Sequence, residues 1–338
     1  MPNNFTHMQP FRITTIAGII AMACLASDTQ VPHWATVTTN GSPTARHESA
    51  MVTVAGKSYL LGGRGIKPVE EFDPATGTWR KLGPTPLEIH HFQPVTFENR
   101  IYVMTAMTGK YPKETPLDTI QIYDPKFDIW RAGPSIPKHR RRGGAGTVVH
   151  KGKIYIAGGI VDGHTSGTVA WFDEFDPKTG AWRELPDAPR IRDHFPAIVA
   201  AGRLYCIGGR NTSYHIPGNF AAFFGAVTPE VDVYDFANRK WTTLPEALPV
   251  PTAAGGLIEH AGKIYYIGGE SARKPAHAET QVLDLKAGKW KLLAPLQQGR
   301  HGGGAVKINR RIYVAAGSGN RGGGPELAST EVFPLSGK

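Results

Sequence analysis

The segment SYLLGG at residues 58–63 recurs along the chain as KIYIAGG at 153–159, RLYCIGG at 203–209 and KIYYIGG at 263–269. Two variants, RIYVMTA at 100–106 and RIYVAAG at 311–317, fill the intervals. Each copy predicts a strand that ends on glycines, because β-forming aromatic and branched residues precede residues that tolerate positive φ. Similarity at a regular period is typical of repeat architectures. The copies therefore indicate a β-fold built from similar units.

A second pattern follows each of the first five copies. An Asp stands after an apolar or aromatic residue, and a Trp stands six residues later. The pairs are Asp73/Trp79, Asp124/Trp130, Asp176/Trp182, Asp235/Trp241 and Asp284/Trp290. Residues 49–63 predict two strands around Ala55-Gly56-Lys57, and residues 69–82 predict two more around a turn at Pro74–Gly77. Each unit is thus expected to hold four strands.

This combination of a glycine pair, an aromatic-Asp step and a Trp at a period near 50 residues resembles the kelch repeat. The resemblance covers nearly all of residues 31–338 and implies an all-β, six-bladed kelch β-propeller without a linker. The sixth copy ends near Phe333, too early for its last strand. The segment PHWATV at 32–37 precedes the first unit and contains Trp34. We therefore expect the N-terminal strand to complete the C-terminal blade, and the tryptophans to pack between blades.

The N-terminal segment predicts a targeting signal. Residues 13–26, ITTIAGIIAMACLA, follow Arg12 and are fewer than the roughly 20 residues of a membrane span. Small residues at Ala21-Met22-Ala23 and Cys24-Leu25-Ala26 offer cleavage sites, so residues 1–26 are expected to be a signal peptide, with Met8 as an alternative start. Cys24 stands where a lipoprotein signal carries its lipid anchor. The prediction is export to the periplasm or medium; the alternative is a mildly apolar disordered tail.

Composition narrows the class of protein. The 338 residues include 40 glycines and 27 prolines and are 41% hydrophobic, which excludes a disordered chain. Two cysteines exclude a disulfide scaffold. Lys plus Arg total 38 against 28 acidic residues, so acidic ligands are favoured, although a basic surface also serves solubility. Residues 139–142 are the one dense basic run, and we expect no nucleic-acid partner.

Candidate binding residues emerge when the six units are aligned just before their first strand. In propellers of this kind these residues meet the loops between the second and third strands at one mouth of the central channel. The first aligned position holds Arg46, Ile89, Arg142, Arg192, Thr252 and Arg300; the second holds His47, His90, Gly143, Asp193, Ala253 and His301; the third holds Glu48, His91, Gly144, His194, Ala254 and Gly302. Clustered arginines favour an anion site. The alternative is that these arginines form hydrogen bonds within the repeat.

The histidines raise the question of a metal. His47, His90, His91, His194 and His301 come from four units, with Glu48 and Asp193 nearby. However, the adjacent arginines disfavour a cation and there is no compact ligand motif. The expectation is no metal and no cofactor. Loops add other polar groups: residues 210–230 include Tyr214, and the loop after Gly159 offers Asp162 and His164.

These patterns predict an exported propeller that binds an acidic saccharide or protein at an Arg- and His-rich mouth. A membrane contact is expected only through a lipid on Cys24. The expected ligand-binding residues are Arg46, His47, His91, Arg142, Arg192, His194, Tyr214, Arg300 and His301. The alternative is a carbohydrate-active enzyme, either a mutarotase or epimerase similar to the kelch-type sialic-acid mutarotases, or a uronate-polysaccharide lyase. The site residues of those mutarotases find no match here, and catalytic residues remain unassigned.

Overall fold

The computed structural model describes residues 1–3 and 32–336. The chain separates into a unit of residues 1–31 and a unit of residues 32–338, and only the second is discussed below. Residues 4–26 of the predicted signal peptide, Cys24 among them, lie outside the described residues. Within the described part of the chain, no helix has both the length and the apolar character needed to cross a membrane.

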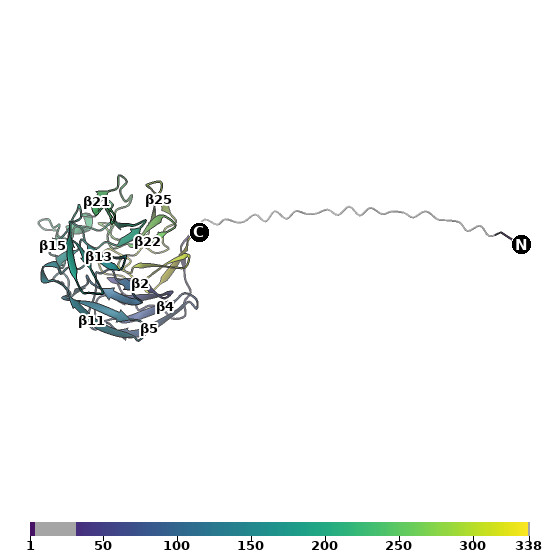
Figure 1. The fold of residues 1–338 in the computed structure, drawn as a ribbon, viewed down its shortest axis with the longest axis horizontal. Coiled ribbons are helices and arrows are strands. Elements are labelled where there is room, and N and C mark those ends of the chain that lie inside the picture. The colour runs from purple at the N-terminus through teal and green to yellow at the C-terminus, as the bar shows by residue number, and fades with distance from the viewer. Residues whose placement is uncertain (4–31, 337–338) are drawn as a thin grey trace. The chain divides into compact units, whose positions relative to one another are not determined.

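Six antiparallel four-stranded sheets form the blades (Figure 1). Blade 1 consists of β2 (Ser49–Val54), β3 (Lys57–Gly62), β4 (Pro68–Asp73) and β5 (Thr78–Pro84). Blade 2 consists of β6 (Val95–Phe97), β7 (Arg100–Val103), β10 (Thr119–Asp124) and β11 (Ile129–Ser135). Blade 3 consists of β12 (Gly146–His150), β13 (Lys153–Ala157), β16 (Phe172–Phe175) and β17 (Trp182–Leu185). Blade 4 consists of β18 (Ala197–Ala200), β19 (Arg203–Cys206), β20 (Asp232–Asp235) and β21 (Lys240–Thr243). Blade 5 consists of β22 (Gly256–His260), β23 (Lys263–Ile267), β24 (Thr280–Asp284) and β25 (Lys289–Leu293). Blade 6 consists of β26 (Ala305–Ile308), β27 (Arg311–Ala315), β28 (Thr330–Pro334) and β1 (Ala35–Thr36).

The first strands of the blades surround a central channel. Contacts run from β2 to β6, then to β12, β18, β22 and β26, and from β26 back to β2. We call the four strands of a blade a, b, c and d from this channel outward. Two b–c loops carry small hairpins, β8 (Met107–Thr108) with β9 (Thr115–Pro116) and β14 (Ile160–Asp162) with β15 (Ser166–Thr168). The described 3₁₀ turns are η1 (Lys138–Arg140) and η2 (Phe220–Gly225).

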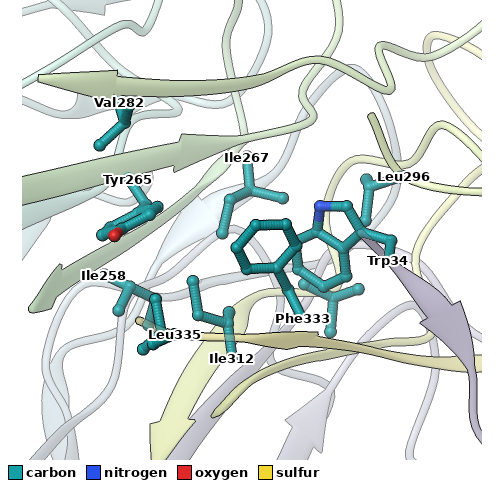
Figure 2. Packing of buried hydrophobic residues seen from close by; sticks show 10 residues of the cluster. Trp34, Ile258, Tyr265, Ile267, Val282, Leu296, Ile312, Phe333 and Leu335 are labelled. Carbon is teal, nitrogen blue, oxygen red and sulfur yellow. The ribbon is translucent and has the colours of Figure 1, made fainter. Parts of the chain in front are cut away.

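The N-terminal strand closes the ring, which confirms the expectation from the sequence. β1 pairs with β28 in the register Ala35↔Val332 and Thr36↔Glu331. Trp34 is fully buried, and its ring lies 5.3 Å from that of Phe333 (Figure 2). The last blade therefore gains its outer strand from the other end of the chain, which leaves no open c-strand edge.

The tryptophans that follow each Asp pack between blades, as predicted. Trp79 of blade 1 shares a core cluster with Tyr313 of blade 6 and donates a 3.0 Å hydrogen bond to Thr330 Oγ1. Trp241 of blade 4 lies edge-on to Phe172 of blade 3, with ring centroids 5.0 Å apart. These rings bury large apolar areas at the seams between blades, where they stabilise the ring as a whole.

The glycine pairs connect one blade to the next. The N–H of Gly63 donates to the Ile89 carbonyl at 2.9 Å, and the N–H of Gly159 donates to the Arg192 carbonyl at 2.8 Å. A Cβ on Gly62, which has φ of +68°, would lie 2.4 Å from the Ile89 carbonyl oxygen. Glycine is therefore required here both for its backbone conformation and for the close approach of the neighbouring blade.

Candidate functional site

The starts of the a strands and the b–c loops meet at one end of the channel, which we call the mouth. Bridges pair His90 with Met107, Asp193 with Arg210, and His301 with Ser318. The b–c loops that gather here are residues 63–67, 104–118, 158–171, 207–231, 268–279 and 316–329. The aligned residues and the b–c loops therefore share one end of the channel, as the sequence predicted.

The arginines of the first aligned position turn into their own blades instead of converging at the mouth. Each is buried and makes an ion pair with a buried carboxylate on the c strand of its blade. The pairs are Arg46–Glu70, Arg142–Asp173, Arg192–Asp232 and Arg300–Glu331, at 2.5–2.7 Å. Each guanidinium also donates to backbone carbonyls near the end of the b strand, such as Gly208 O for Arg192 at 2.9 Å. This geometry favours the structural alternative, in which the arginines tie each blade together.

Burial lowers the pKa of Arg46, Arg142 and Arg300, while the paired carboxylates act in the opposite direction. Because every charge is matched inside its own blade, the expectation of a shared anion site at these four positions lacks the geometry it needed. These four guanidiniums therefore do not form a group of unpaired charges whose repulsion an anionic ligand would relieve.

The third aligned position encircles the channel. Its six members all have positive φ, between +52° and +63°, although four of them are not glycine. They form a closed series of backbone hydrogen bonds that passes from blade to blade. The donor–acceptor steps are His91 N to Glu48 O, Gly144 N to His91 O, His194 N to Gly144 O, Ala254 N to His194 O, Gly302 N to Ala254 O and, one residue on, Ser49 N to Gly302 O, at 2.6–3.2 Å. We call this closed series the annulus.

Glu48, His91 and His194 occupy a backbone conformation that ordinarily suits glycine. Left-handed backbone at a residue other than glycine costs roughly 1–3 kcal/mol and is enriched at functional sites. All six annulus residues line a cavity of about 130 Å³ at the centre of the ring. Three of the polar side chains that line this cavity, those of Glu48, His91 and His194, therefore come from the third aligned position, two residues after the position that holds the arginines.

A third histidine joins the two of the annulus. His164 lies in the turn between β14 and β15 and is buried. Its ring centroid is 5.1 Å from those of His91 and His194, which are 4.7 Å from each other. We call these three residues the histidine cluster. The sequence pointed to His91 and His194 as ligand-binding residues and noted His164 only as a loop residue.

Carboxylates surround the histidine cluster. Asp193 Oδ1 lies 2.5 Å from His194 Nδ1, Glu114 lies 3.1 Å from His164 Nδ1, and Glu48 Oε2 lies 2.9 Å from His91 Nε2. Further out, Arg64 pairs with Glu114 at 2.7 Å, and Arg210 pairs with Glu270. Arg64, Arg210 and Glu270 all follow a glycine pair directly, a signal in the repeat that the sequence reasoning did not use.

The ionisation of these groups follows from burial and pairing. Burial acts to raise the pKa of Glu48, but the adjacent His91 imidazole outweighs it and the pKa lies well below the usual value. In the same way, the hydrogen bond from His194 and the charge of Arg210 hold the pKa of Asp193 at about 2. Burial lowers the pKa of His91 and His194, and with Arg64 it lowers the pKa of His90 to about 4. At neutral pH, Glu48 and Asp193 are therefore ionised, whereas His90, His91 and His194 are neutral.

The remaining predicted residues lie around this centre. His47 pairs with Glu326 at 2.7 Å, and His301 Nε2 lies 2.9 Å from the carbonyls of Asn320 and Gly322. Tyr214 is exposed on the long loop of blade 4. In that loop Phe223 is buried beneath the Arg210 guanidinium, at 4.9 Å from its ring centroid. The loop thus covers one side of the mouth.

Comparisons with known proteins agree with this architecture. The family model for the attractin/LZTR1 β-propeller matches residues 21–261. The Kelch-like protein terF of Aspergillus terreus is 30% identical over 90% of this chain and 70% of its own length. Kelch-like protein 40 of Xenopus tropicalis is 29% identical over 54% of this chain, a match that spans only 29% of that protein. The solved structure of YjhT superposes with a TM-score of 0.72 at 17% identity and covers 86% of this chain and 95% of YjhT. The repeat, the six closed blades and these matches together show that the chain belongs to the kelch-repeat β-propeller family.

Proposed function

We propose that the protein binds an acidic segment of a partner protein on the face formed by the b–c loops. The observation that carries this proposal is the concentration of exposed large hydrophobic side chains there. Among the described residues, half of the ten exposed large hydrophobics lie on b–c loops. They are Ile66, Tyr111, Tyr214, Ile216 and Phe220. Exposed aromatic residues with polar tips are typical of protein recognition surfaces.

Charge on the same loops supports an acidic partner. Five basic residues are exposed there against three acidic ones. The basic residues are Lys110, Lys113, Arg273, Lys274 and Arg321, and the acidic residues are Asp118, Asp162 and Glu326. With a formal net charge of +10 for the whole chain, the field around the molecule would speed association with acidic partners at low salt. The arginines buried inside the blades have no part in this proposal.

The test uses synthetic acidic peptides that contain aromatic residues, with binding followed by fluorescence anisotropy at several salt concentrations. The double variant Lys110→Glu/Lys113→Glu should weaken binding at least tenfold, because it reverses two charges beside Tyr111. The matched control Lys151→Glu/Arg310→Glu alters exposed a–b turns at the other end of the blades and should leave affinity unchanged. Equal losses in both variants would contradict a specific binding face. Hyaluronate or oligouronate that binds where the peptides do not would favour a saccharide ligand.

A carbohydrate-active enzyme is the second candidate, and one observation favours it. His194 Nδ1 lies against Asp193, and its Nε2 is buried without a hydrogen-bond partner. An imidazole held by a carboxylate on one side and free on the other has the arrangement of a general base. NMR spectra of sialic acid and of oligouronates incubated with the protein would reveal anomer exchange or unsaturated products, and His194→Gln should abolish either. We also propose that the chain is exported through its N-terminal segment.

A further inference from the structure

The histidine cluster lies among loops from three blades, deeper than the exposed loop surface. His91 precedes β6 in blade 2, His164 lies in the b–c loop of blade 3, and His194 precedes β18 in blade 4. All three are buried, and one nitrogen from each ring lies within 4.8 Å of the nitrogens offered by the other two. The rings meet edge to face, at angles of 61–73°. Three imidazoles that converge in this way match the protein ligand set of a three-histidine metal centre.

The second nitrogen of each ring already has a partner. His194 Nδ1 lies 2.5 Å from Asp193, His164 Nδ1 lies 3.1 Å from both Glu114 oxygens, and His91 Nδ1 lies 2.6 Å from the Nδ1 of His90. Metal-binding histidines are almost always oriented by such an outer hydrogen bond. A histidine that donates its Nδ1 proton to a carboxylate presents the lone pair of Nε2 to the other side.

The opposite nitrogens of His194 and His91 supply independent evidence for a ligand, whereas Nε2 of His164 lies 3.4 Å from the Arg210 guanidinium, a contact that a bound ion would replace. Nε2 of His194 is buried without a hydrogen-bond partner. Nε2 of His91 lies 2.9 Å from a Glu48 oxygen but is not aligned to form a hydrogen bond with it. A buried, unpaired polar atom is costly, and native structures usually satisfy it with a partner, a water or an ion. Both histidines and Glu48 also line the central cavity, which leaves space beside the cluster.

The charges around the cluster are incompletely matched. Arg64 pairs with Glu114, and Arg210 pairs with Glu270. Glu48 and Asp193 are buried, yet neither makes an ion pair with an arginine or lysine among the described residues. Two buried carboxylates without an arginine or lysine partner, beside three imidazoles, favour a doubly charged cation. The arginines that argued against a cation in the sequence are directed into their own blades.

We propose that His91, His164 and His194 bind one divalent transition-metal ion, with Glu48 beside it and an open side toward the central channel. Imidazole nitrogen suits Zn²⁺, Cu²⁺, Ni²⁺ and Fe²⁺ better than Mg²⁺ or Ca²⁺. The acidic residues Asp193 and Glu114 orient the ligands rather than bind the ion. The histidine cluster lies inside the mouth, apart from the peptide-binding face.

The experiment uses the full chain without an affinity tag, treated with a chelator and then titrated with Zn²⁺ by calorimetry and with Co²⁺ by visible absorption. One equivalent of Zn²⁺ should bind, and Co²⁺ should develop the d–d bands of a low-coordinate nitrogen site. Outer-shell changes typically weaken metal binding about 10–100-fold, so Asp193→Asn should fall in this range. Loss of a ligand in His164→Ala should weaken binding more than about 100-fold.

The matched control is His260→Ala, at the end of β22 and on the far side of the blade, which should bind Zn²⁺ as the unmodified chain does. Circular dichroism and the melting temperature of each metal-free variant check that the fold is intact. If His164→Ala fails to fold, His164→Gln keeps the side-chain volume and replaces it. The proposal is overturned if the unmodified chain shows no saturable Zn²⁺ binding near one equivalent, or if a folded His164 variant binds Zn²⁺ with unchanged affinity.

Discussion

Trp34 Nε1 donates a 2.8 Å hydrogen bond to Thr280 Oγ1, 246 residues later in the chain. Trp34 precedes the strand that completes blade 6, whereas Thr280 begins the c strand of blade 5. Gln297 strengthens this seam, because its side-chain amide donates to the Trp34 carbonyl at 2.8 Å. The N-terminal strand is thus held both by β28 and by the neighbouring blade.

Deletion of residues 31–38 should destabilise the whole ring, because blade 6 would lose its outer strand and the Trp34 side chain. Trp34→Ala alone should cost about 3–5 kcal/mol of unfolding free energy, as for other fully buried aromatic side chains. Thermal and urea denaturation would measure both effects. Thr280→Val, which removes only the hydrogen bond, should cost about 1 kcal/mol. A deletion variant that melts at the unmodified temperature would refute closure by this strand.

Arg192→Ala should lower stability and leave the affinity for acidic peptides unchanged. The guanidinium of Arg192 is buried and contacts Asp232 and the Gly208 carbonyl, so its removal leaves a buried carboxylate with less compensation. Breaking a buried ion pair costs about 3–5 kcal/mol, and the remaining pairing of Asp232 with Arg190 should reduce this figure.

Urea denaturation and anisotropy on the same Arg192→Ala protein separate the two interpretations of the arginines. Adding Asp232→Asn to the variant should recover part of the lost stability, since the uncompensated charge is then removed. Unchanged stability with a tenfold loss of affinity would restore the shared anion site predicted from the sequence.

Asp176→Asn should reduce stability at neutral pH but not in acid. The Lys153 ammonium, together with the backbone N–H of Lys178, holds the pKa of the Asp176 carboxyl at about 2. An unfolded Asp has a pKa of about 3.9, so the folded state favours the ionised form. The stabilisation is present above about pH 4 and is lost as the pH falls toward 2. Melting curves should therefore differ most at pH 6 and converge near pH 2; a constant difference would contradict this assignment.

Gly302→Ala should destabilise the annulus more than Gly262→Ala destabilises an a–b turn. Both glycines have positive φ, +62° and +72°, which costs alanine roughly 1–2 kcal/mol. At Gly302 a Cβ would also lie 2.9 Å from the Glu48 backbone nitrogen, whereas at Gly262 nothing lies within 4 Å. The difference between the two unfolding free energies measures the close contact between blades. Equal losses of unfolding free energy would mean that the backbone of the annulus shifts to accommodate the extra methyl group.

The exported protein should begin near Cys24 or Ser27, because the small residues at 21–23 and 24–26 offer cleavage sites after an apolar segment. Mass spectrometry of the protein recovered outside the cytoplasm would identify the new N-terminus, and a mass increase on Cys24 would reveal lipidation. An intact Met1 in that fraction would refute processing.

The repeat in the sequence determined the architecture of this protein. Glycine pairs, Asp turns and tryptophans act through local backbone conformation and through contacts that recur in every blade, so their spacing alone predicts six blades. The position of Trp34 before the first repeat also predicted the closing strand, because a missing d strand at one end matched an additional strand at the other.

Tertiary structure decided where the polar side chains go. An alignment of repeats gives the position of Arg46 or Arg192 along the chain, but a long guanidinium can turn toward the channel or into its own blade. The buried carboxylates Glu70 and Asp232, which lie 24 and 40 residues later, draw it inward. The alignment of repeats did not include His164 for another reason. It lies on a hairpin in a b–c loop, and most blades have no corresponding hairpin. Only the fold of that hairpin brings His164 next to His91 and His194.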